Sequence, residues 1–321
     1  MTNAPASLGQ ETWPGVEIWR GGVNTWDCDE MGHMNVRFYV VRAMEGLVGL
    51  AAEMGLPHAF APHANATLVV REHHIRFLKE AHAGAPLHML GGVIEIGDSE
   101  ARLLQLLVHS ATGELAATFQ TTVAHVTPRE GEAFPWPTIV RERAKALMVE
   151  IPERAQARSV DLSPAVPQAS LARADALGLA RISLGALGAG ESDVFGRMRA
   201  EQFIGRVSDG IGAFIAPLRD IVAEAAETPP GRVGGAVLEY RIVYLAWPRL
   251  GDRLEVRSGL IGGEGRVMRC AHWLLNPDTG QAWATSTVSA ITFDLDARKA
   301  VAISPAASAK LEERSVAGLG L

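Results

Sequence analysis

The chain has 321 residues, of which 48% are hydrophobic and 21% are charged, and its formal net charge is −6 at pH 7. This balance predicts a globular protein with a sizeable core and excludes an intrinsically disordered chain. The negative charge argues against nucleic acid as the main partner, because binding to phosphates needs a basic face.

Three features of the sequence concern the compartment. Residues 1–10 lack a basic segment followed by an apolar one, so we expect no secretory signal. No run of about 18 apolar residues is present to span a bilayer, so no membrane partner is expected. The two cysteines, Cys28 and Cys270, give neither a disulfide framework nor a metal-binding spacing. The expected location is the cytoplasm.

The first predicted elements are a strand over residues 16–23 and a helix over residues 35–54. Apolar residues recur every three to four positions along this helix, which predicts a buried face. Gly46 and Gly49 lie inside it, where each costs roughly 1 kcal/mol relative to alanine. We therefore expect close packing against the helix. Four strands follow, over residues 67–79, 87–96, 101–109 and 114–126.

The same order is predicted again later in the chain. Residues 127–168 are rich in proline and charge, which is typical of a linker, with a short helix over residues 139–149. A helix followed by an antiparallel meander is an α+β unit, in which the helix covers one face of the sheet. The second copy comprises a strand over residues 181–187, a helix over 199–216 and strands over 233–247, 253–261, 266–276 and 281–294.

The sequence itself carries the repeat. Asp29 and the residues around it recur at Asp193 with a shift of 164, and the strand that contains Val70 recurs at Val237 with a shift of 167. A duplicated domain is the economical explanation. We predict one domain over residues 1–127, a linker over 128–168 and a second domain over 169–321.

The turn before the first helix carries two acids, Asp27 and Asp29, and Asn35 stands at the helix start. Amides at a helix N-terminus stabilise the negative charge that a carbonyl oxygen gathers under attack. A carboxylate beside that point can act as a nucleophile or as a general base for water. The alternative is structural, because Asp and Asn before a helix usually cap it.

The motif Asp-x-Asp-x-x-Gly-His-x-Asn, the long helix and the meander together resemble the hot-dog-fold acyl-CoA thioesterases, and most closely the group around 4-hydroxybenzoyl-CoA thioesterase. The resemblance implies an α+β double hot dog, two tandem units that each wrap an antiparallel sheet around a long helix. It implies that the second acid, Asp29, is the catalytic carboxylate, and that Gly32 and the amide of Val36 bind the thioester carbonyl. Only the alignment with this family's motif favours Asp29 over Asp27 as the catalytic acid.

Four further residues are predicted to contact substrate: His33, Asn35, Tyr39 and Glu45. His33 either orients the turn or touches substrate. A related acyl-carrier-protein branch has Asn where Met31 stands here, so a direct catalytic role for His33 is not expected. For Asn35 the alternative is the helix cap, and for Glu45 a structural or water-holding role.

The second copy keeps an acid, Asp193, but has Arg197 and Arg199 in place of His33 and Asn35. The two arginines either hold the phosphates of CoA or are solvated. Their charge should keep Asp193 paired, so we expect one competent site, at Asp29. Because Asn caps about as well as Asp, replacing Asp193 by Asn should cost little stability.

The sequence therefore predicts an acyl-CoA thioester hydrolase with no metal and no redox cofactor. His73 and His74 are adjacent on a strand and point to opposite faces, so they make poor joint metal ligands. A non-catalytic acyl-CoA-binding or regulatory hot-dog module and a hot-dog dehydratase are the alternatives. The two copies form a pseudo-dimer within one chain, and a further homo-oligomer stays open.

Overall fold

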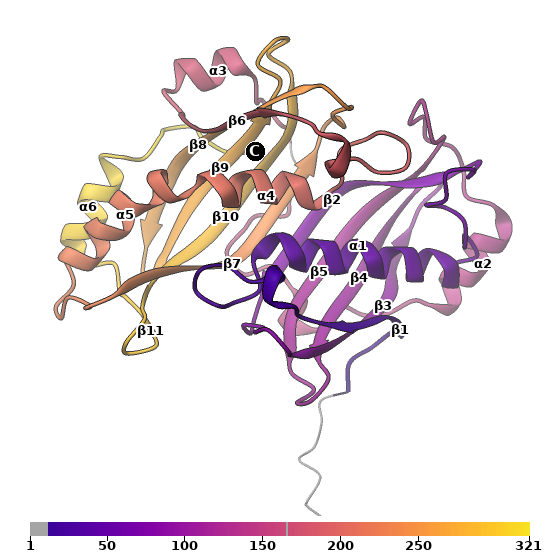
Figure 1. Cartoon of the computed structure of the whole chain (residues 1–321), viewed down its shortest axis with the longest axis horizontal. Helices are drawn as coiled ribbons and strands as arrows, with labels where there is room; N and C mark the ends of the chain where they lie inside the picture. Colours follow the sequence, from indigo (N-terminus) through magenta and orange to yellow (C-terminus); the bar gives the residue numbers. More distant parts are fainter. Residues whose placement is uncertain (1–11, 165) are drawn as a thin grey trace, which may run out of the picture.

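The computed structural model describes residues 12–164 and 166–321 (Figure 1). Each half contains a strand, a helical segment and a four-stranded meander, as predicted. The first half comprises β1 (Val16–Gly22), α1 (Val36–Glu53), β2 (Thr67–Phe77), β3 (Pro86–Ile96), β4 (Glu100–His109) and β5 (Leu115–Val126). The second half comprises β6 (Ala180–Ala186), α4 (Glu201–Gly210), α5 (Gly212–Glu224), β7 (Val233–Tyr244), β8 (Arg253–Glu264), β9 (Val267–Leu275) and β10 (Ala282–Asp294).

The two halves share one continuous antiparallel sheet. Its strand order is β1-β3-β4-β5-β2-β7-β10-β9-β8-β6, with the short β11 (Lys299–Ala300) paired to β10. At the junction of β2 and β7, His74 pairs with Arg241, which is its own equivalent at the repeat shift of 167. A pseudo-twofold axis therefore passes between these residues. Helices α1 and α4 cover the same face of the sheet (Figure 1), which confirms the double hot dog.

Glycines allow both long helices to lie directly on the edge strands. A Cβ atom at Gly49 would overlap the carbonyl oxygen of Ile18 on β1, and one at Gly210 would overlap that of Ile182 on β6. The close packing predicted from the helix glycines is therefore confirmed, and it recurs in the second half.

The second helical segment is not the single helix expected over residues 199–216. It is interrupted at Ile211, which separates α4 from α5, and it extends to Glu224. Gly210 and Gly212 flank the interruption, and glycine is a poor helix former. Pro217, inside α5, also lacks the N–H group that would bond to the preceding turn. The apolar periodicity continued through these residues and concealed the break.

Among the described residues, three further α-helices lie outside the two long helical segments. The short helix predicted in the linker is present as α2 (Thr138–Ala146), which packs near β3. Helices α3 (Leu171–Ala176) and α6 (Pro305–Glu312) were not predicted from the sequence.

His73 and His74 point to opposite faces of the sheet, as predicted. His73 Nδ1 lies 2.8 Å from the hydroxyl of Tyr244, whose ring packs edge-on against Phe203 of α4. His74 Nε2 lies 2.7 Å from Glu239 Oε1 on the other face.

The pseudo-twofold axis relates two contacts between a glutamate and a basic side chain that join β2 to β7. Arg241 forms two hydrogen bonds with Glu72, at 3.0 and 2.9 Å, and His74 bonds to Glu239. Glu72 and Glu239 are repeat equivalents, and so are His74 and Arg241. The same pairing of a glutamate with a basic side chain therefore occurs twice across the junction.

The linker lies over these pairs. Arg241 Nη1 donates to the carbonyls of Asp161 and Ser163 at 2.8 and 2.9 Å. Glu239 accepts the backbone N–H of Ser159 at 2.6 Å. Although burial acts to raise it, hydrogen bonds from His74, Ser159 and linker amides lower the pKa of Glu239 to about 2.

The buried histidines predict loss of stability in acid. Burial lowers the pKa of His73 and of His272 to about 3, whereas histidine in an unfolded chain titrates near 6.5. As the pH falls, the unfolded state therefore binds protons before the folded state does. The contribution of these neutral rings to the free energy of unfolding is full above about pH 6.5 and is lost as the pH falls towards about 3. We expect the urea midpoint to fall between about pH 7 and pH 5, and His272→Gln to flatten that dependence. An equal slope in wild type and variant would contradict this expectation.

Candidate functional site

The first acid of the turn, Asp27, is a structural group. It is 1% exposed, and its Oδ2 accepts hydrogen bonds from the Asn24 amide at 2.9 Å and from Arg42 Nη2 at 2.8 Å. Glu191 and Arg206 make the equivalent ion pair in the second half, at 2.6 Å. Asp27 therefore anchors the turn to the helix, which leaves Asp29 as the candidate reactive acid.

Asp29 is partly exposed and is held by the backbone alone. Its Oδ1 accepts the N–H groups of Met31 at 2.9 Å and His33 at 3.3 Å. Among the described residues, none donates a hydrogen bond to its Oδ2. Gly32 permits this tight loop because its φ is +79°, in the left-handed region. One carboxylate oxygen is thus fixed, and the other is available to a reactant.

The start of α1 supplies one unengaged amide beside this acid. Asn35 caps the helix, with its side-chain oxygen accepting from Arg37 N at 3.0 Å. The amide of Gly32 donates to the Asp29 carbonyl at 3.0 Å, so it is already occupied. The amide of Val36 has no acceptor among the residues described. Of the two carbonyl-binding groups predicted, Val36 therefore has the free donor, whereas Gly32 shapes the turn.

His33 and Tyr39 both lie at this turn. His33 Nε2 is 3.4 Å from Glu80 Oε2, and its ring packs edge-on against that of His82. Tyr39 is buried against Phe77. Burial raises the pKa of Tyr39, and the charges of Glu80 and Asp29 raise it further. The predicted residues His33 and Tyr39 are therefore near Asp29, and Glu80 joins them.

His33, Glu80 and His82 also form a cluster with the donor types of a metal site. Their ligand atoms lie within 4.8 Å of one another. However, the Arg298 guanidinium is 2.8 Å from Glu80 Oε2, so an arginine already supplies the positive charge that a cation would bring to this carboxylate.

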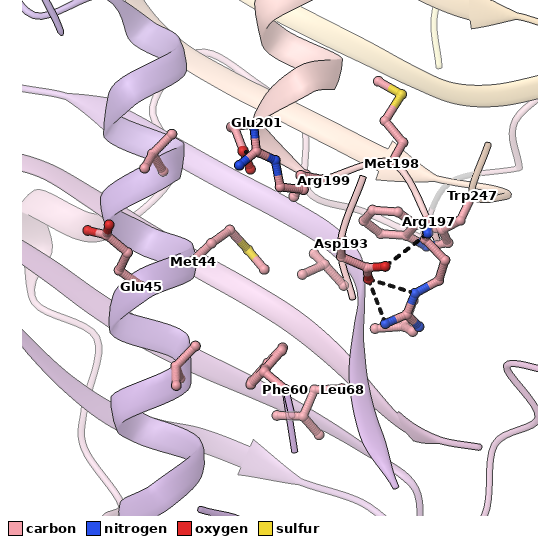
Figure 2. A pocket seen from close by; sticks show the side chains of 15 residues that line it. Met44, Glu45, Phe60, Leu68, Asp193, Arg197, Met198, Arg199, Glu201 and Trp247 are labelled. Carbon is pink, nitrogen blue, oxygen red and sulfur yellow. Dashed lines mark hydrogen bonds and ion pairs between the residues drawn. The ribbon is translucent and has the colours of Figure 1, made fainter. Parts of the chain in front are cut away.

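The second turn has the same backbone but a different electrostatic state. Asp193 Oδ1 accepts from the amides of Phe195 and Arg197 at 2.8 and 2.9 Å, as Asp29 does in the first turn. Its Oδ2 is paired with Nε and Nη2 of Arg197, both at 2.9 Å (Figure 2). Arg197 is 5% exposed. Arg199 instead pairs with Glu201 at 3.0 Å.

A pocket of about 280 Å³ lies beside the second turn, not the first. Its walls come from both halves, and Met44 of α1 points towards Asp193 (Figure 2). Glu45 lines this pocket and also bonds at 3.2 Å to Arg42, the arginine that holds Asp27 at the first turn, so its contact with substrate stays a prediction. Ten residues of helix separate Glu45 from Asn35, which is about 15 Å of rise, and the pseudo-twofold axis brings Glu45 to the other turn.

Glu80 is the residue at the first turn that sequence reasoning missed. It follows β2, on a segment remote in sequence from the Asp29 motif, so no local spacing connects them. The repeat could have pointed to Glu80, because the shift of 167 aligns it with Trp247, which lines the pocket beside the second turn. The two halves therefore differ at this position as well as at His33.

No helix among the described residues is long and apolar enough to cross a membrane. A family model described as the thioesterase-like superfamily matches residues 23–144 and, separately, residues 187–311. The curated proteins include no significant sequence match.

Solved structures of similar architecture cover nearly the whole chain. The 12:0-ACP thioesterase from Umbellularia californica has a TM-score of 0.64 at 11% identity, over 85% of this chain and 92% of that chain. A putative oleoyl thioesterase from Lactobacillus plantarum has 0.65 at 9%, over 87% and 97%. An acyl-ACP thioesterase from Bacteroides thetaiotaomicron VPI-5482 has 0.61 at 10%, over 85% and 96%. At these identities the similarity is one of fold.

Proposed function

Because the chain belongs to the thioesterase-like superfamily, with both halves matched, we propose that it hydrolyses acyl-CoA thioesters at the turn of its first half. Thioester hydrolysis in general follows from the family. The residues and the CoA substrate are the parts that we propose.

Asp29 is the proposed catalytic carboxylate. Its unengaged Oδ2 can attack the thioester carbonyl or take a proton from an attacking water. The amide of Val36 is the proposed donor to the carbonyl oxygen, which gathers negative charge in either route. Neither step needs the side chain of Asp27, which is buried against Arg42.

The observation that carries this proposal is the difference between the two turns. Both hold an aspartate by two backbone amides, but only Asp193 has its second oxygen paired with a guanidinium. A guanidinium at that distance occupies the oxygen with which Asp193 would attack a carbonyl or take a proton from water. The first turn is therefore the better candidate for chemistry.

The test is release of free thiol from a panel of short, long and aromatic acyl-CoAs. We expect saturable release from at least one member. Binding of the panel with no release from any member would favour the non-catalytic acyl-CoA-binding module instead. Comparing the best acyl group as a CoA and as a carrier-protein thioester would then test the CoA assignment.

Glu80 is proposed to position His33 and the turn below it. A partly exposed ion pair is worth at most about 1 kcal/mol, so Glu80→Gln should lower kcat by up to about fivefold, with KM and the unfolding midpoint unchanged. Glu80→Asp should restore part of the loss. Glu114→Gln, which breaks the exposed pair with Lys79, is the matched control. A fall in the unfolding midpoint without a change in kcat would show a purely structural role.

A further inference from the structure

The pocket beside the second turn has an apolar wall built by the first half. Val41, Met44 and Val48 of α1 line it, together with Phe60 and Leu68. Trp247 closes the side towards the second half (Figure 2). Apolar surface dominates this lining, which suits an aliphatic group more than a polar one.

The equivalent wall of the first turn is small and polar. A shift of 164 places Gly205, Ser208 and Gly212 where Val41, Met44 and Val48 stand. Side chains from the start of α1 also extend into the space beside this wall.

Two side-chain contacts join the start of α1 to α4 in this space. Asn35 donates to the Ser208 hydroxyl at 3.0 Å, and Arg37 pairs with Asp209 at 2.5 Å. The Arg37 guanidinium lies where a Cβ atom of Gly205 would be. The two ends of the α1–α4 helix pair are therefore specialised differently.

The second turn keeps the means to bind a carbonyl but not the means to attack one. The amide of Ala200, which lines the pocket, has no acceptor within the described chain, like the amide of Val36. Asp193, the acid beside it, is neutralised by Arg197. A carbonyl oxygen can therefore be held there without a free carboxylate to activate water.

We propose that this pocket binds the aliphatic acyl group of an acyl thioester without hydrolysing it, as a second ligand site on the same chain. Its volume of about 280 Å³ equals roughly nine water molecules at liquid density, which suits an aliphatic chain of short to medium length, such as a decanoyl group, and not a long one. The inference goes beyond the proposed activity and needs no turnover at Asp29.

The experiment counts ligands per chain by calorimetry with S-(2-oxodecyl)-CoA, a ketone that keeps the carbonyl but has no thioester bond to cleave. We expect two sites in the wild type and in Asp29→Asn. Val48→Trp fills the pocket from its partly exposed rim and should remove one site, and Met44→Trp should do the same from inside. Ile139→Trp, at a similarly exposed apolar position on α2 outside the pocket, should keep both sites.

The outcomes separate this inference from the proposed function. One site per chain that Val48→Trp leaves unchanged would overturn the second site and leave the role of Asp29 intact. Cleavage of decanoyl-CoA by Asp29→Asn that Val48→Trp abolishes would show that the second pocket is catalytic, which contradicts both. Two sites reduced to one by Val48→Trp, with no cleavage in Asp29→Asn, would support the inference.

Discussion

Asp29→Asn is expected to lower kcat/KM for the best acyl-CoA by at least about 10²-fold, the low end of acid–base contributions. The amide oxygen of asparagine can still accept the N–H groups of Met31 and His33, which hold Asp29 Oδ1 at 2.9 and 3.3 Å. The turn should therefore persist while the reactive carboxylate is lost. Thiol release measures the activity, and the unfolding midpoint checks that the fold is retained.

The repeat provides the matched control, Asp193→Asn, which should leave turnover within about twofold of the wild type. The structure changes one expectation for this variant. Asp193 is the ion-pair partner of Arg197, which is 5% exposed, so its removal leaves a buried guanidinium unpaired. A stability loss is therefore expected, in place of the small cost expected for exchanging one cap for another. Half the activity remaining in Asp29→Asn, abolished in the double variant, would show that both turns are catalytic.

Asp27→Asn separates the two acids of the first turn. It should lower the unfolding midpoint, because Arg42 loses a buried partner, and it should lower turnover much less than Asp29→Asn. Equal losses of turnover in the two variants, with the fold of each intact, would count against Asp29 as the reactive acid.

Local patterns in the sequence were sufficient for most of the fold. Alternation of apolar residues and turn signals predicted every strand of both meanders, and the numbering shifts predicted the pseudo-twofold pairing now seen at His74 and Arg241. The break at Ile211 was missed because apolar periodicity reports which face of a helix is buried, not whether the backbone is continuous. Helix α6 was missed although the shift of 167 relates it to α2, the short helix that was predicted after the first meander.

The residues of the predicted site that are close in sequence also lie close together in the structure. Asp29, His33, Asn35, Val36 and Tyr39 lie within one turn and the first coils of α1, so the motif placed them together. Helical spacing gives the face on which Glu45 lies but not what lies opposite it, which here includes the pocket beside the turn of the other half. Glu80 was missed for a related reason, since the fold alone brings it to His33.

Arg241→Met is expected to lower the free energy of unfolding by about 3 kcal/mol, the range for breaking a buried ion pair. The side chain of Arg241 is 3% exposed, and it satisfies both Glu72 and two linker carbonyls. The substitution leaves all three acceptors without their donor at the point where the halves and the linker meet. Urea unfolding measures the loss.

Arg232→Met is the matched control, because its pair with Asp296 is largely exposed, at 71% and 51%, and exposed ion pairs contribute little to stability. Adding Glu72→Met to Arg241→Met should recover part of the stability, because the Glu72 carboxylate is then no longer left unpaired. The recovery should be incomplete, because the carbonyls of Asp161 and Ser163 still lack their donor. Recovery near zero would assign the stability mainly to the linker contacts, and full recovery mainly to the ion pair. If Arg241→Met costs no more than Arg232→Met, the junction of β2 and β7 does not depend on this pair, and the backbone pairing of the two strands and their other contacts join the halves.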